Sequence, residues 1–133
     1  MTATKNAQSL PSKILVVDDE ALVRSMMCDG LAAAGHAVLA AASGEEALQV
    51  VHAERPGCIL MDIMMPDLDG YDTCAALKAD SRTASIPVLL VSATTDARVA
   101  EQAKRVGAAG VLRKPVRVDE LRRAIAHALG APA

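Results

Sequence analysis

Short apolar runs alternate five times with amphipathic segments along this chain. The runs are rich in Val, Ile, Leu and Met, as expected for strands buried on both faces, and they predict strands at residues 13–18, 36–41, 57–62, 86–92 and 110–113. The other segments repeat apolar residues at helical spacing and predict helices at about 20–34, 43–53, 71–79, 94–106 and 118–129. This alternation indicates βα units on a parallel sheet with right-handed crossovers.

Several residues refine the predicted helices. Ser43, followed by Glu46, gives a capping box for the second helix. Thr94 or Thr95 is the expected N-cap of the fourth helix. The first helix is expected to bury one apolar face, made of Leu22, Val23, Met26, Met27 and Leu31.

Composition narrows the class of protein. The chain has 133 residues, 52% of them hydrophobic, which suits one domain at residues 12–130 behind a disordered tail at 1–11. Aromatic residues make up only 1% and the net charge is −2, so we expect no direct nucleic-acid binding. No segment is apolar for long enough to serve as a membrane anchor or a signal sequence. With Cys28, Cys58 and Cys74 read as reduced thiols, we expect a cytoplasmic protein without a membrane partner.

Charged residues stand at the carboxyl ends of three predicted strands. Asp18 and Asp19 end the first, Asp62 ends the third, and Lys114 follows the fifth. In an open parallel α/β sheet these ends converge on one ligand-binding crevice. Three carboxylates there would repel one another unless a cation such as Mg²⁺ held them together, and the lysine would balance an anion on one of them. The alternative is that the aspartates only cap helices or begin turns.

Four motifs, in this order and at these spacings, resemble the receiver domain of two-component response regulators over about residues 12–130. They are Val16-Val17-Asp18-Asp19-Glu20, Met61-Asp62-Ile63-Met64-Met65-Pro66 with Asp69-Gly70, Ser92-Ala93, and Lys114-Pro115. The resemblance implies a flavodoxin-like doubly wound (βα)5 fold with a five-stranded parallel sheet of order 2-1-3-4-5. It also implies a phosphorylation-controlled signalling switch and not an enzyme that turns over an external substrate.

The resemblance assigns a role to each matching residue. Asp62 would accept a phosphoryl group from a histidine kinase or a histidine phosphotransfer protein. Mg²⁺ would be bound by Asp62 and Asp19, by Asp18 mainly through water, and by the backbone carbonyl of Met64. Lys114 would pair with Asp62 at rest and with a phosphoryl oxygen afterwards, and its bond to Pro115 would be cis. A second phosphoryl oxygen would accept a hydrogen bond from Ser92.

Two positions depart from the family pattern. Val111 stands where relatives usually carry Tyr or Phe, so we expect signalling to be weaker or to rely on the loop from Ser92 to Thr95 and on the fourth helix. Arg117 stands where a capping residue is usual before the fifth helix, which predicts a frayed start or one held by Asp119.

The charge distribution suggests a partner. Residues 1–92 carry 6 basic and 12 acidic side chains, a net of −6, whereas residues 93–133 carry 8 basic and 4 acidic, a net of +4. The basic part includes the fourth helix, fifth strand and fifth helix, the usual output surface of the family. It is interpreted either as a solvated surface or, more specifically, as a binding surface for an acidic effector protein. The resemblance also allows a phosphorylation-dependent dimer.

Three alternatives to a stand-alone switch stay open at this level. The chain could be the receiver part of a longer regulator. It could be a constitutive docking module, for which Val111 leaves room although the acidic residues are intact. It could also be a magnesium-dependent phosphatase on a similar fold, but the sequence offers no insertion for a substrate pocket.

Overall fold

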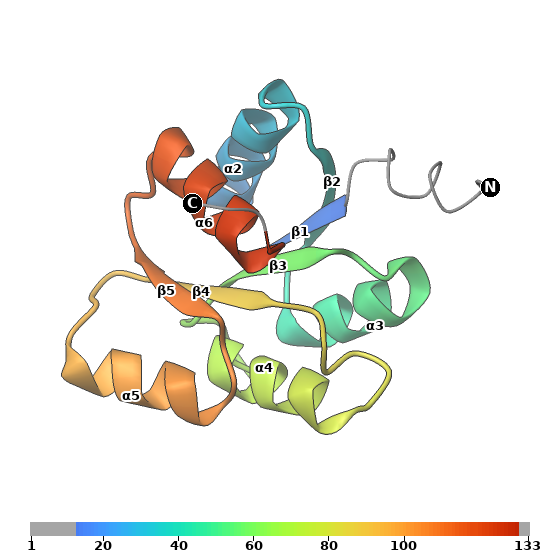
Figure 1. Cartoon of the computed structure of the whole chain (residues 1–133), viewed down its shortest axis with the longest axis vertical. Coiled ribbons are helices and arrows are strands. Elements are labelled where there is room, and N and C mark those ends of the chain that lie inside the picture. The colour runs from blue at the N-terminus through green and yellow to red at the C-terminus, as the bar shows by residue number, and fades with distance from the viewer. Residues whose placement is uncertain (1–12, 131–133) are drawn as a thin grey trace.

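The computed structural model describes residues 13–130, in which strands and helices alternate as predicted (Figure 1). The strands are β1 (Lys13–Val17), β2 (Ala37–Ala41), β3 (Cys58–Asp62), β4 (Val88–Ser92) and β5 (Gly110–Arg113). The helices are α2 (Ala21–Ala33), α3 (Gly44–Glu54), α4 (Gly70–Ala79), α5 (Ala97–Arg105) and α6 (Val118–Ala128). The tail predicted at residues 1–11 lies outside the described residues.

The five strands form one parallel sheet in the order β2-β1-β3-β4-β5, which confirms the predicted doubly wound fold. Figure 1 shows α2 and α6 over one face of the sheet and α3, α4 and α5 over the other. The three inner strands are thus covered on both sides, which explains why their sequences are continuously apolar.

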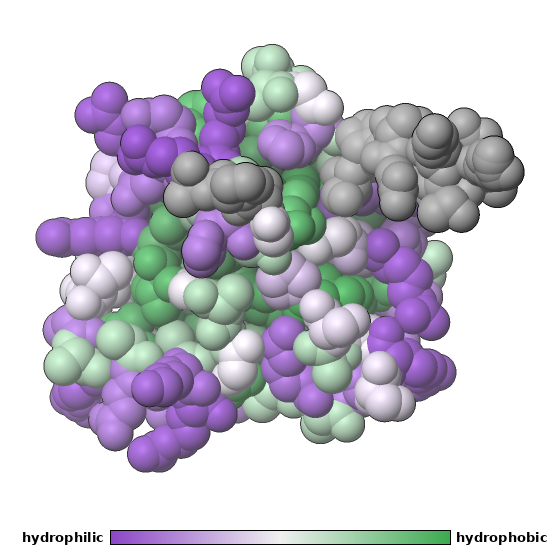
Figure 2. Space-filling model, viewed as in Figure 1, coloured by the Kyte–Doolittle hydropathy of each residue, from purple (hydrophilic) through white to green (hydrophobic). Residues whose placement is uncertain are grey.

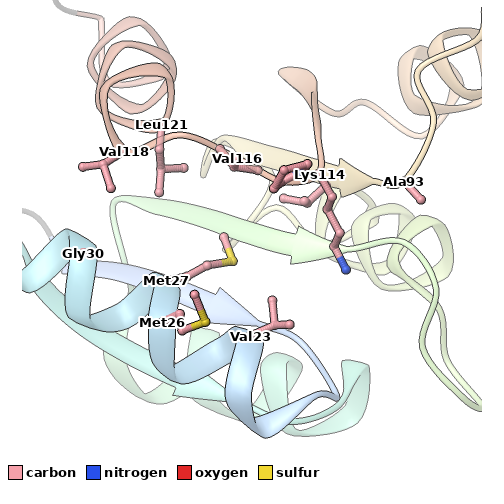
Figure 3. Close-up of a pocket in the computed structure, with 11 residues that line it drawn as sticks. Val23, Met26, Met27, Gly30, Ala93, Lys114, Val116, Val118 and Leu121 are labelled. Atoms are coloured by element: carbon pink, nitrogen blue, oxygen red, sulfur yellow. The ribbon is translucent and has the colours of Figure 1, made fainter.

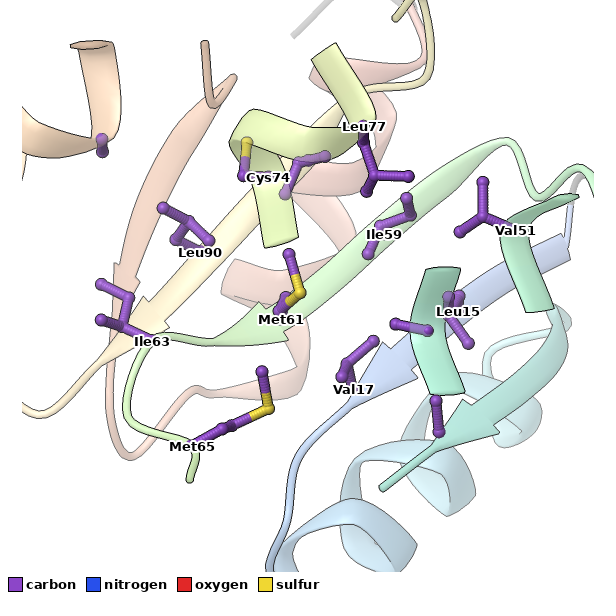
Figure 4. Close-up of a cluster of buried hydrophobic side chains, with 14 residues drawn as sticks. Leu15, Val17, Val51, Ile59, Met61, Ile63, Met65, Cys74, Leu77 and Leu90 are labelled. Atoms are coloured by element: carbon purple, nitrogen blue, oxygen red, sulfur yellow. The ribbon is translucent and has the colours of Figure 1, made fainter. Parts of the chain in front are cut away.

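The core is divided by the sheet into two clusters. Because successive side chains of a strand point to opposite faces, Leu15 and Val17 belong to the cluster beneath α3, α4 and α5, whereas Ile14 and Val16 belong to the one beneath α2 and α6. Figure 4 shows the larger cluster, where Met61 of β3 lies among side chains from neighbouring strands and helices. Since β1 and β3 are fixed from both sides, the residues at their carboxyl ends are held firmly in place.

The predicted cap of α5 is wrong. The helix begins after Asp96, whose carboxylate accepts a hydrogen bond from the Val99 N–H at 3.0 Å. Thr94 instead donates its backbone N–H to the Ser92 hydroxyl at 3.2 Å, so the residues after β4 form a loop before the helix starts.

The predicted cap of α3 is confirmed, since the Ser43 hydroxyl accepts from the Glu46 N–H at 3.0 Å. The missing side-chain cap at Arg117 is confirmed as well.

The apolar face of α2 is only partly buried. Leu31 is fully buried, but Leu22 and Met26 are 73% and 64% exposed, contrary to the prediction. Leu31 belongs to the cluster beneath α2 and α6, Met27 packs against that cluster, and Val23 lines the cavity between the two helices. The apolar stripe is therefore wider than the surface against which the helix packs.

Candidate functional site

Three carboxylates converge at the carboxyl ends of β1 and β3. Val17 is the register partner of Met61, so the next residues, Asp18 and Asp62, leave the sheet side by side. One carboxylate oxygen from each of Asp18, Asp19 and Asp62 lies within 4.8 Å of the others. Asp18 is 1% exposed and Asp62 is 5% exposed, whereas Asp19 is open to solvent.

The Asp18 position is fixed by four contacts. Its backbone N–H donates to the Ala41 carbonyl of β2 at 3.2 Å, which extends the sheet by one residue. Its Oδ1 atom accepts from the Glu20 N–H at 2.9 Å, and its Oδ2 atom lies 3.6 Å from the Lys114 ammonium. Its backbone carbonyl accepts from Nη1 of Arg24 at 2.7 Å. No motif in the sequence pointed to Arg24, because its contact with Asp18 depends on the path of the chain between β1 and α2.

Lys114 reaches the carboxylates from the end of β5. Its Nζ atom lies 3.3 Å from Oδ2 of Asp62 and 3.6 Å from Oδ2 of Asp18. Its backbone N–H donates to the Ser92 carbonyl at 2.8 Å, and the peptide bond to Pro115 is cis, as predicted. The contact with Asp62 was expected, but the one with Asp18 was not.

The electrostatics of the site work against a charged Asp62. Burial raises the pKa of this carboxyl above its usual value, Asp18 raises it further, and Lys114 and the Met64 backbone only partly offset this. Burial by itself would lower the pKa of Lys114, but attraction to Asp62 and Asp18 outweighs burial and raises it. The site thus holds more negative charge than one ammonium balances, which is the condition under which a divalent cation binds well.

The loop after β3 returns closely against the strand. A side chain at Gly70 would place its Cβ atom 2.5 Å from the Asp62 carbonyl oxygen, so only glycine allows this return. Met64 lies in the loop with its side chain 76% exposed and its backbone beside the Asp62 carboxylate. Its role as a carbonyl ligand stays a prediction.

Ser92 and Val111 lie on the β4–β5 side of the site. Ser92 is 7% exposed and follows Val91, the register partner of Asp62. Val111 is the partner of Leu90 and is half-buried against the cluster beneath α5. A branched side chain therefore occupies the strand position where an aromatic ring was expected from the resemblance.

The carboxylate set fits a magnesium ion. Mg²⁺ prefers hard oxygen ligands and usually takes only a few from the protein while it keeps several waters. Two of the three carboxylates are buried and one is open to solvent, which suits such a partly hydrated ion. Asp18, Asp19 and Asp62 are the predicted protein ligands that the structure brings together.

Comparison with known proteins places the chain in a family. Residues 14–126 match the model of the response regulator receiver domain. The chain is 38% identical over 109 residues to a probable transcriptional regulator, ycf27, of Guillardia theta, and 37% identical over 112 residues to the response regulator MprA of Mycolicibacterium vanbaalenii. These alignments cover 82% and 84% of the chain but only 42% and 48% of the relatives, so the chain spans less than half of their length.

Solved structures support the same family assignment. The chemotaxis protein CheY4 of Vibrio cholerae superimposes with a TM-score of 0.86 at 31% identity, covering 90% of this chain and 99% of that one. The receiver domain of the sensor histidine kinase PA1611 from Pseudomonas aeruginosa, whose structure has a magnesium ion coordinated in the active site cleft, superimposes with a TM-score of 0.84 at 26% identity, covering 92% and 100%. Among residues 13–130, no helix has the length and apolar character needed to cross a bilayer. The chain belongs to the response regulator receiver domain family and is a signalling domain of two-component systems.

Proposed function

We propose that this chain accepts a phosphoryl group on Asp62 and changes its protein contacts in response. The observation that carries the proposal is the convergence of three carboxylates, within 4.8 Å, on a strand end that Lys114 also reaches at 3.3 Å. Phosphoryl transfer needs in-line positioning and neutralisation of charge, with little covalent help from the protein. This arrangement supplies both requirements.

Each residue has one task in the transfer. A carboxylate oxygen of Asp62 attacks phosphorus, the P–N bond to the donor imidazole breaks, and the imidazole keeps the electron pair and takes a proton from solvent. Lys114 moves its hydrogen bond from the carboxylate to a phosphoryl oxygen, and Ser92 donates to another. Mg²⁺, held by Asp18, Asp19, Asp62 and the Met64 carbonyl, would supply charge neutralisation when bound. Water attack on the acyl phosphate would later reset the switch.

The surface around the site suits a protein donor better than a small molecule. Within residues 13–130, Leu22, Met26, Met64 and Val118 are among the large hydrophobic side chains that are exposed, and Met26 and Val118 line a cavity that Lys114 also lines. A cavity of about 520 Å³ opens between α2 and α6 and extends to the stem of Lys114 (Figure 3). Exposed apolar patches of this kind mark protein interaction sites. We assign this surface to the histidine kinase or phosphotransfer protein.

The output surface is proposed to be α5, β5 and α6. All of its basic side chains are exposed, namely Arg98, Lys104, Arg105, Arg113, Arg117, Arg122 and Arg123. Figure 2 shows hydrophilic side chains over α5 and α6. An acidic partner would be steered to this surface, so its association rate should fall steeply with added salt, and a rate independent of salt would contradict the assignment.

Coupling between the site and this surface would run through the loop after β4. Residues 93–98 are all exposed, and Ser92 touches the loop through the Thr94 N–H. A shift of the Ser92 hydroxyl toward the phosphoryl group would break that contact and release the start of α5. Val111, whose branched side chain has few χ1 options, contributes little to the coupling.

Intact-mass measurement after incubation with acetyl phosphate and Mg²⁺ tests phosphoryl transfer. The wild type and Asp72→Asn, which removes an exposed carboxylate of α4, should each gain one phosphoryl group, whereas Asp62→Asn should gain none. EDTA added beforehand should prevent the gain. Labelling of Asp62→Asn would identify a different acceptor, and no labelling of any protein would favour the constitutive docking module.

The same samples report the conformational switch. Tyr71 is the sole aromatic residue of the chain, and it lines a cleft with Asp96, Val99 and Gln102 of α5. Its fluorescence should therefore change on phosphorylation in the wild type and stay constant in Asp62→Asn. Unchanged emission despite full phosphorylation would contradict coupling through α5.

The longer relatives support a second arrangement, in which this receiver controls an effector domain of a longer regulator. The proposed chemistry at Asp62 is the same in both arrangements. Cys28, Cys58 and Cys74 are free thiols, as expected in a reducing compartment, so we place this signalling in the cytoplasm.

A further inference from the structure

We infer that Arg24 is a positioning residue for the magnesium site, an inference that rests on the proposed function. Asp18 and Asp19 are neighbours, and neighbouring side chains of a strand point in opposite directions. Both can reach one ion only if the chain turns immediately after Val17. Three residues separate the end of β1 from the start of α2, so this turn decides where the two carboxylates lie.

Arg24 closes the turn from the helix side. Its backbone N–H donates to the Glu20 carbonyl at 2.9 Å, while its Nη1 atom reaches back to the Asp18 carbonyl at 2.7 Å. Glu20 makes no side-chain capping bond at the start of α2, and the first turn of this helix contains no acidic residue. Within the described residues the turn is therefore held by the Oδ1 atom of Asp18 on the Glu20 N–H and by the Arg24 guanidinium on the Asp18 carbonyl.

Two roles for Arg24 make opposite predictions. If Arg24 acted only as a nearby positive charge, its removal would leave the carboxylates more negative and would tighten Mg²⁺ binding. If it orients the ligands, its removal lets the turn relax and weakens binding, as loss of residues that orient metal ligands does. The short bond to a backbone carbonyl favours orientation, because it fixes the position of the chain without occupying a carboxylate oxygen of Asp18 or Asp19.

Mg²⁺ titration calorimetry on Arg24→Ala, Arg24→Lys and Arg82→Ala tests this inference. Arg24→Ala should bind Mg²⁺ on the order of tenfold more weakly than the wild type. Arg24→Lys keeps the charge and one donor and should recover part of the affinity. Arg82→Ala removes an exposed arginine at the amino end of the sheet and should bind as the wild type does. Equal or tighter binding by Arg24→Ala would overturn the inference.

Amide hydrogen exchange without metal supplies a readout independent of binding. The Glu20 N–H, bonded to Asp18, should exchange faster in Arg24→Ala than in the wild type and in Arg82→Ala. Wild-type exchange at this amide in Arg24→Ala would overturn the positioning role. If the wild-type protein bound no Mg²⁺ while Arg24→Ala still exchanged faster, the magnesium part of the proposed function would fail and the structural role of Arg24 in the turn would stand.

Discussion

The amino and carboxyl ends of the sheet both carry charged side chains but hold them differently. At the amino end, Lys78 donates to the carbonyls of Ala84 and Ile86 at 2.9 and 2.6 Å, and Asp80 accepts hydrogen bonds from Arg82. At the carboxyl end, three carboxylates lie together, and two of them share one ammonium. The amino end satisfies its polar groups within the chain, whereas the carboxyl end keeps a deficit of positive charge that a ligand can fill.

This difference follows from what each end must do. Polar groups that bind one another contribute to stability but leave nothing for a partner. Like charges held close together lower the stability of the free protein, and their repulsion decreases when a cation or a phosphoryl donor binds. Replacing a carboxylate should therefore change stability in opposite directions at the two ends, and replacing a lysine should give a loss that responds to Mg²⁺ only at the carboxyl end.

Replacement of a lysine at each end should give the largest contrast. Lys78→Met should lower the free energy of unfolding by about 2–3 kcal/mol, because it removes a charged donor from two carbonyls. Lys114→Met should cost about 1–2 kcal/mol in EDTA, because it leaves buried carboxylates without their cation while Lys114 itself is partly exposed. Urea denaturation followed by circular dichroism measures both.

Magnesium separates these two losses. Mg²⁺ should reduce the difference in free energy of unfolding between Lys114→Met and the wild type, since the ion neutralises the same carboxylates. The difference for Lys78→Met should stay unchanged. If Mg²⁺ did not change the loss of stability in Lys114→Met, the shortage of positive charge at the carboxyl end would be contradicted.

Asp62→Asn should have a smaller effect of the opposite sign. Burial and Asp18 raise the pKa of the Asp62 carboxyl, so the folded state disfavours its charge. A neutral side chain of the same shape should raise the free energy of unfolding in EDTA by about 0.5–2 kcal/mol, as substitutions at functional residues can. The same denaturation assay measures the gain, and Asp72→Asn, on the exposed side of α4, should show none. If Asp62→Asn were less stable than the wild type, the attraction of Lys114 for the Asp62 carboxylate would outweigh the unfavourable effects of burial and of Asp18.

The sequence predicted the carboxyl end better than the details around it. Asp18 and Asp62 could be placed together because apolar runs mark the strands and parallel strands meet at one edge. Sequence alone could not tell Asp96 from Thr94 as the cap of α5, since either side chain can accept a backbone N–H and the loop geometry decides. It also missed Arg24, because this contact depends on the turn between β1 and α2.

The exposed face of α2 was missed for a related reason. Periodicity finds the apolar rows of a helix but not the width of the surface that covers them. Leu22 and Met26 continue the apolar stripe past the row that touches the sheet. The proposed partner surface rests on this same excess of apolar surface.

The smallest predicted difference between the ends is the loss at low pH of the stability that Asp80 contributes. Hydrogen bonds from the Arg82 side chain and backbone lower the pKa of Asp80 to about 2, with His52 also nearby. A carboxyl whose pKa is lowered by folding contributes stability that is complete above its unfolded pKa and is lost as the pH falls through the folded value. The stability difference between the wild type and Asp80→Asn should therefore be constant above about pH 5 and should decline toward pH 2.

Urea denaturation of Asp80→Asn and Arg82→Gln at a series of pH values makes this test. Asp80→Asn should lack the acid-dependent component that the wild type shows. Arg82→Gln should show a smaller one, because it removes the guanidinium bonds but keeps the backbone N–H of residue 82. The Asp80 carboxylate is partly exposed, so added salt should also reduce the difference. If the stability of Asp80→Asn fell with pH in parallel with the wild type, the Asp80–Arg82 pair would not contribute to folding. The amino end would then rely on its other contacts, among them the hydrogen bonds of Lys78 and Thr83.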